Sequence, residues 1–167
     1  MSMHSITVSP SKNANGVIEW TLTYGSNSGT NGNYPPVDLK HGGTNERFRI
    51  TLVDSTYGIT FSDDPLWIKE GSCPTTSGIN SKQIDKYEPG QTIVRFRDRN
   101  ENAAVTLWYR LNFNVPDLNP GDPGTFLDPE IRNGGGGGTG GIGITALAIA
   151  VGVAVLGYVA YEAFLNN

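Results

Sequence analysis

The chain has 167 residues and a formal net charge of −4, from 12 Lys and Arg against 16 Asp and Glu. This acidic balance removes the usual driving force for sequence-independent binding, so nucleic acid is not an expected partner. The 22 glycines show no G-X-Y period, which excludes a collagen-like helix. The single cysteine, Cys73, cannot close an intrachain disulfide and is expected to be a half-buried structural residue.

Apolar and polar residues alternate with period two through much of residues 1–133, and this pattern predicts β-strands. In chain order the predicted strands are 5–9, 18–24, 48–52, 58–61, 66–68, 94–96 and 104–115. Residues 25–46 and 71–89 resist strand assignment and are expected to form long loops. Short strands at this spacing are typical of a sandwich, so we predict a mainly β, antiparallel immunoglobulin-like β-sandwich over residues 1–133.

Several short acidic and proline motifs resemble the DP-EP family of small bacterial proteins. In this sequence they are Val53-Asp54-Ser55, 61–65 (FSDDP), Gly71-Ser72-Cys73-Pro74, Asp98-Arg99-Asn100, Tyr109-Arg110-Leu111 and 126–133 (FLDPEIRN). The resemblance covers residues 5–133. It implies an immunoglobulin-type sandwich of unassigned function, and it implies no activity. The glycine-rich segment and the apolar segment that follow are departures from a free-standing domain of that kind.

Arginines occupy the positions opposite the apolar residues of three predicted strands. They are Arg47, Arg49, Arg95, Arg97 and Arg110, with Arg99 just beyond the sixth strand and Trp108 beside Arg110. If the three strands are neighbours, these side chains form a basic stripe with an aromatic beside it, which suits an anionic or protein partner. The alternative is a solvated sheet face whose arginines pair with acids on adjacent strands.

Acidic residues gather at three other places, and each has a structural interpretation. Asp98 to Asn102 begins like a calcium loop, but it has Tyr109 where the closing Glu belongs, so a turn is expected. Asp63 and Asp64 are expected in a turn that ends a strand before Pro65. The acids of 117–130 are interspersed with prolines, which favours an extended strap. No catalytic, metal or cofactor motif is recognised, so we expect neither an enzyme nor a cofactor.

Beyond residue 133 the composition changes. Residues 134–141 are almost entirely glycine and predict a linker, and 142–161 contain no charge and no proline. Twenty such residues in a helix span about 30 Å, so we predict a hydrophobic transmembrane helix over 142–165. The alternative is a helix packed inside a protein assembly. Small residues form two stripes that predict helix packing and a homo-oligomer: Ala146, Ala150, Ala154 and Gly157, and Ala148 with Gly152.

Residues 1–10 contain no apolar run of the kind a secretory signal has, so none is expected there, and Arg132 precedes the apolar segment while Glu162 follows it. Under the positive-inside rule we expect a single-pass membrane protein with a cytoplasmic N-terminal domain, or a protein of a virion membrane. The expected function is non-enzymatic: a tail-anchored structural or interaction protein that displays its sandwich at a membrane. One alternative is a virion structural protein, in a membrane-containing phage or as a coat subunit. The other is a membrane effector whose clustered helices perturb the bilayer.

Overall fold

The computed structural model describes residues 2–30, 32–39, 45–54, 56–101 and 105–133. Within them the chain is mainly β, as predicted, and contains no helix. The predicted linker 134–141, the predicted helix 142–165 and all of its small residues, from Ala146 to Gly157, lie outside the described residues. Among the described residues there is no helix of the length and apolarity that crossing a membrane requires.

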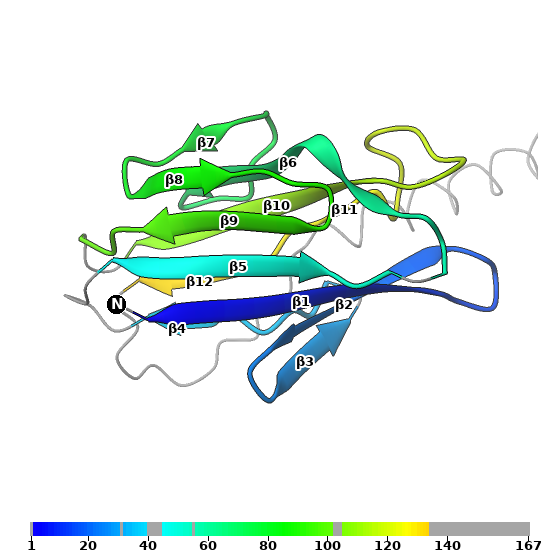
Figure 1. Cartoon of the computed structure of the whole chain (residues 1–167), viewed down its shortest axis with the longest axis horizontal. Helices are drawn as coiled ribbons and strands as arrows, with labels where there is room; N and C mark the ends of the chain where they lie inside the picture. Colours follow the sequence, from blue (N-terminus) through cyan, green and yellow to red (C-terminus); the bar gives the residue numbers. More distant parts are fainter. Residues whose placement is uncertain (1, 31, 40–44, 55, 102–104, 134–167) are drawn as a thin grey trace, which may run out of the picture.

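The strands form two sheets, and Figure 1 shows sheet A in front of sheet B in a sandwich-like arrangement. Sheet A has the order β3-β2-β1-β5-β9-β8, and sheet B has the order β4-β12-β10-β6-β7, with β11 also paired to β10. The strands of sheet A are β1 (Met3–Lys12), β2 (Ile18–Tyr24), β3 (Asn27–Thr30), β5 (Glu46–Leu52), β8 (Ile84–Glu88) and β9 (Ile93–Asp98). Those of sheet B are β4 (Val37–Leu39), β6 (Thr60–Glu70), β7 (Ile79–Asn80), β10 (Thr106–Asn114), β11 (Phe126–Leu127) and β12 (Glu130–Asn133).

The prediction of purely antiparallel sheets is wrong, because both sheets are mixed. Strand β1 runs parallel to β5, β12 runs parallel to β4, and β6 runs parallel to β7. A strand with one buried face shows the same alternation of residues whether its neighbour is parallel or antiparallel. The pattern therefore specified which face is buried and left the direction of pairing open.

The turn predicted at Asp63 and Asp64 is also wrong, since both residues lie inside β6. The pairing of β6 with β10 passes from Phe61 opposite Phe113 to Leu66 opposite Leu111. The intervening residues bulge out of the ladder, which keeps the two aspartates exposed while the strand continues. Segments expected to be loops or a strap contribute the short strands β3, β4, β7, β8, β11 and β12.

The core is formed by inward-facing side chains of both sheets. Trp20 of sheet A stacks on Phe113 of sheet B with ring centroids 3.9 Å apart, and Phe113 stacks in turn on Phe61 at 5.2 Å. The indole nitrogen of Trp20 donates a hydrogen bond of 2.8 Å to the carbonyl of Gly124. This bond satisfies the polar end of a buried tryptophan and ties the 115–125 segment to sheet A.

Candidate functional site

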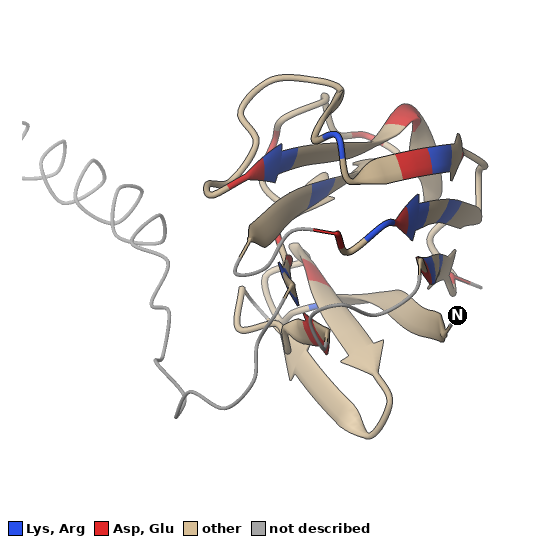
Figure 2. Cartoon of the chain, turned by 90° about the vertical axis from the view of Figure 1, so that its left-hand side faces the viewer, with Lys and Arg blue, Asp and Glu red and all other residues tan. Residues whose placement is uncertain are grey.

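Strands β5 and β9 place four arginines on the outer surface of sheet A. The register sets Arg47 opposite Arg97 and Arg49 opposite Arg95. The alternate residues of both strands are buried, so the four arginines share the opposite face. We call Arg47, Arg49, Arg95 and Arg97 the arginine face. In Figure 2 Lys and Arg lie on neighbouring strands of the upper part, whereas the β2–β3 hairpin at the bottom carries none.

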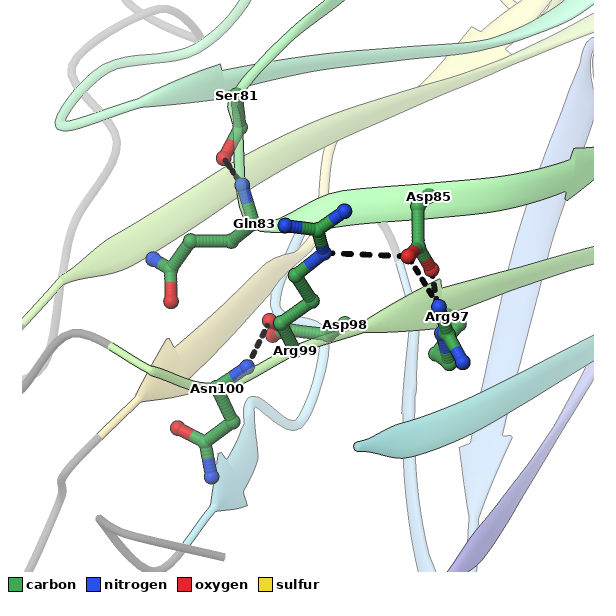
Figure 3. Close-up of polar contacts among 7 residues, drawn as sticks. All are labelled: Ser81, Gln83, Asp85, Arg97, Asp98, Arg99 and Asn100. Carbon is green, nitrogen blue, oxygen red and sulfur yellow. Dashed lines mark hydrogen bonds and ion pairs between the residues drawn. The ribbon is translucent and has the colours of Figure 1, made fainter. Parts of the chain in front are cut away.

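Strand β8 supplies acids to one side of this face. Arg97 donates from two guanidinium nitrogens to the two carboxylate oxygens of Asp85, and Arg99 donates to the same carboxylate at 3.1 Å (Figure 3). Arg95 lies 3.9 Å from a carboxylate oxygen of Glu88, and both side chains are largely exposed. A bidentate arginine–carboxylate pair is the stronger arrangement, so Arg97 is the most fully neutralised member of the arginine face.

The side of the face next to β1 has no such acids. Met3 lies opposite Arg47 and Ser5 lies opposite Arg49 in the β1–β5 ladder. Among the described residues no carboxylate lies within ion-pair distance of Arg47 or Arg49. Like charges directly opposite one another across strands are destabilising. Sheet A therefore has two opposed arginine pairs. Two of the four side chains, Arg95 and Arg97, have a carboxylate within ion-pair distance, and only Arg97 is held by both carboxylate oxygens.

The pairing with Arg97 and Arg99 lowers the pKa of the Asp85 carboxyl to about 2. A lowered carboxyl pKa means that the pair contributes stability above the unfolded pKa of about 3.8, and that this stability is lost as the pH falls through about 2. We expect the stability difference between the wild type and Asp85→Asn to be constant near neutral pH and to shrink from pH 4 to pH 2. Urea denaturation at each pH measures it. Exposed Asp63→Asn is the control, and a difference that grows in acid would contradict the assignment.

The predicted stripe is wrong in one respect: Arg110 and Trp108 lie in β10 of sheet B, not beside the arginine face. Arg110 donates to both oxygens of Asp128, at 2.7 and 3.1 Å. Its guanidinium also lies 4.2 Å from the ring centre of Phe126 and 5.5 Å from that of Trp67. These contacts occupy Arg110 locally and assign it a structural role on the outer face of sheet B.

Cys73 lies close to the Arg110–Asp128 pair. Burial and the nearby Asp128 raise the pKa of its thiol to about 11. A thiol with a raised pKa is protonated at neutral pH and is a poor nucleophile. Its half-buried position agrees with the structural role expected from the sequence.

Sequence reasoning missed a polar cluster at the end of the sandwich that holds the N-terminus. The imidazole of His4 contacts the Tyr24 hydroxyl at 2.7 Å and a carboxylate oxygen of Glu46 at 3.1 Å. Glu46 lies opposite Asp98 in the β5–β9 ladder, and Asp98 is fully buried. Burial raises the pKa of the Asp98 carboxyl and that of the Tyr24 phenol. The signal was present, because Glu46, Asp98 and His4 all occupy inward-facing positions of their strands.

A turn was expected at Asp98 to Asn102, and the structure has one at the first of these residues. One carboxylate oxygen of Asp98 accepts a hydrogen bond of 2.8 Å from the backbone nitrogen of Asn100, which has a φ of 50° (Figure 3). Both features are typical of an Asx turn. The rest of the expected calcium-like sequence lies partly outside the described residues. Within the described part no group of three His, Cys, Asp or Glu side chains is placed to hold a metal ion.

No family model, curated protein or solved structure matches the chain.

Proposed function

We propose that this chain is a non-enzymatic interaction module that is tethered to a membrane and contacts anionic lipid headgroups through its arginine face. The opposed arginine pairs of β5 and β9 carry the proposal. They cost folding free energy in the isolated chain, and an anionic surface would remove that cost by supplying the missing counter-charge. Guanidinium groups suit this role because they bind phosphate bidentately.

The neighbouring surface favours headgroups over single-stranded nucleic acid. The outward positions of β1 beside the face are Met3, Ser5 and Thr7, and β5 continues with Thr51. None is aromatic, so bases would find no ring on which to stack. Hydroxyl groups beside arginines would add hydrogen-bond donors for phosphate oxygens.

The proposed membrane tether is the apolar segment 142–165, whose length as a helix matches the thickness of a bilayer. A cytoplasmic leaflet is negatively charged and attracts basic side chains within about a Debye length of it. Tether and arginine face would then act together, since a linked second contact is effectively intramolecular. The immunoglobulin-like class and the DP-EP resemblance are part of the same proposal, supported by two packed sheets with their core between them.

A non-enzymatic role is supported by the chemistry of two half-buried groups. The Cys73 thiol and the Tyr24 phenol both have raised pKa values, which keeps each protonated and weakly nucleophilic near neutral pH. The Glu46 carboxylate accepts from His4 and from the backbone nitrogen of Ser2, bonds that fix the N-terminal end of β1.

Asp85→Asn tests the arginine face by a gain of binding. Removing this carboxylate frees Arg97 and Arg99, so the affinity for vesicles of phosphatidylcholine with phosphatidylglycerol should rise about fivefold at 0.1 M salt. Cosedimentation of the chain shortened after Asn133 measures it, because this form lacks the predicted membrane segment. The same change should lower the free energy of unfolding. Because binding should rise while stability falls, the two effects can be told apart. Equal or weaker binding by the variant would refute the face as the lipid contact.

The tether is tested separately. The full chain should sediment with membranes and resist extraction by carbonate, whereas the chain ending at Asn133 should be released by salt. A full chain that stays in solution without detergent as a large assembly would favour a packed tail and refute the tether.

A further inference from the structure

A groove lies at the opposite end of the sandwich from the N-terminus. It is lined by parts of three segments at the right-hand side of Figure 1: the β1–β2 connection at 13–17, Thr56 with Tyr57, and the 115–125 segment. Its volume is about 530 Å³, within the range of small-molecule sites. Lys12, Val17, Ile18, Tyr57, Pro116 and Leu118 are among the residues that line it.

Side-chain caps hold the surrounding segments in place. The Asn13 side-chain oxygen accepts from the backbone nitrogens of Asn15 and Val17, at 2.9 and 3.1 Å. The Asp54 carboxylate accepts from three backbone nitrogens between 56 and 59, the shortest of these bonds being 2.6 Å. Asp122 accepts from the backbone nitrogen of Asn119 at 2.8 Å. Segments fixed in this way lose little entropy on binding, so the groove is preorganised.

The rim of the groove is apolar and exposed. Val17 is 45% exposed and Leu118 is 40% exposed, and both are among the few large apolar side chains exposed in the described part of the chain. Leu118 follows Asp117, whose φ of 69° is one that Asp tolerates in turns. The Leu118 nitrogen donates a hydrogen bond of 3.2 Å to the carbonyl of Val115, and this bond closes a turn over Pro116 and Asp117. The turn holds an apolar side chain in solvent at the edge of a groove.

One cation faces this apolar surface without an acidic partner. The Lys12 ammonium lies 5.4 Å from the ring centre of Tyr57, and no carboxylate of the described residues lies within ion-pair distance of it. Asp117 lines the same groove and forms no ion pair with Lys12. An apolar trough beside an uncompensated ammonium is complementary to a molecule with an apolar chain and a negative head.

We propose that this groove binds an anionic amphiphile, with its alkyl chain between Val17 and Leu118 and its carboxylate or phosphate head at Lys12. The site is separate from the arginine face and does not depend on the proposed function. Each methylene buried in the trough should strengthen binding about fourfold until the groove is full.

The test uses the full chain in neutral phosphatidylcholine vesicles and a decanoate that carries a photoactivatable diazirine. After irradiation, mass spectrometry should map the adducts to residues 12–18, 56–57 and 115–123. Decanoate should compete better than octanoate. If the site accepts either a carboxylate or a phosphate head, decyl phosphate should compete as well as decanoate does. If the site is specific for a carboxylate, decyl phosphate should compete less well. Decanol and decyltrimethylammonium should compete poorly.

The variants separate charge from shape. Lys12→Gln and Leu118→Asn should each reduce labelling at least fivefold, whereas Asp117→Asn should increase it because a repulsive carboxylate is lost. Exposed Lys82→Gln and Val53→Asn, which lie outside the groove lining, are the matched controls. Circular dichroism establishes that each variant is folded. Adducts spread over the whole sandwich, equal competition by the cationic amphiphile, or labelling unchanged in both groove variants would each overturn the proposal.

Discussion

The triple variant Arg47→Gln, Arg49→Gln, Arg95→Gln should weaken binding to phosphatidylglycerol vesicles about 100-fold. Each basic side chain near an anionic membrane contributes about 1 kcal/mol, so three together contribute about 3 kcal/mol. These three are the members of the arginine face without a bidentate acid partner, which leaves their guanidinium groups available to phosphate. The loss should shrink as salt is raised, because these exposed charges are screened. Cosedimentation over a salt series measures both effects.

A matched control removes the same number of charges elsewhere. Lys69→Gln, Lys82→Gln and Arg132→Gln lower the net charge equally and leave the arginine face intact. We expect this control to weaken binding less than fivefold. Equal weakening by both triple variants would mean that vesicles respond to total charge only, and the arginine face would lose its role. The arginine variant should also be no less stable than the wild type, since the opposed pairs of like charge are relieved.

Features that depend on neighbouring residues were predicted well from the sequence, and features that depend on distant residues were not. Strand β10 was predicted almost to its ends, because Leu107, Tyr109, Leu111 and Phe113 alternate with polar residues over one uninterrupted strand. The outward direction of the arginines in β5 and β9 followed from the same alternation. Such a pattern depends only on neighbours in the sequence, which is why it can be recognised without knowing the fold.

Pairing between distant strands could not be predicted in the same way. Arg110 has the same alternation as Arg95, yet β10 pairs with β6, β11 and β12 while β9 pairs with β5 and β8. Which sheet a strand joins is decided by packing and connections across the whole chain, and no local pattern records it. The short edge strands β4 and β7 were missed for a related reason, since two or three residues are too few to establish a period.

The buried acids show a different limit. A search for apolar residues passes over Glu46 and Asp98, although Glu46 has the inward position two residues before Phe48 and Asp98 has the one two residues after Phe96. The alternation predicts their direction correctly, and only the expectation that acids are exposed hides them. In the fold Glu46 contacts His4, which the pairing of β1 with β5 brings beside it. Asp98 accepts a hydrogen bond from the backbone of Asn100, which the turn after β9 brings beside it.

The aromatic stack between the sheets carries the second large prediction. Phe113→Ala should lower the free energy of unfolding by about 3–5 kcal/mol, because it removes a buried ring and leaves a cavity. Phe113 is 3% exposed and contacts Trp20 of the opposite sheet and Phe61 of its own, so neither neighbour can move into the space without breaking its own packing. Native domains have only about 5–15 kcal/mol of stability, so the loss is a large part of the total.

Urea denaturation of the chain ending at Asn133, followed by tryptophan fluorescence, measures this change. Phe113→Leu is the informative companion, since it keeps most of the apolar volume and should lose less than Phe113→Ala. Val53→Ala, at a side chain 54% exposed, should change stability by less than about 0.5 kcal/mol. A loss below about 1 kcal/mol in Phe113→Ala would mean that the two sheets are not joined through this stack. Trp67 and Trp108 also emit, so a Trp67→Phe, Trp108→Phe background leaves Trp20 of the stack as the reporter of whether the remaining core has opened to water.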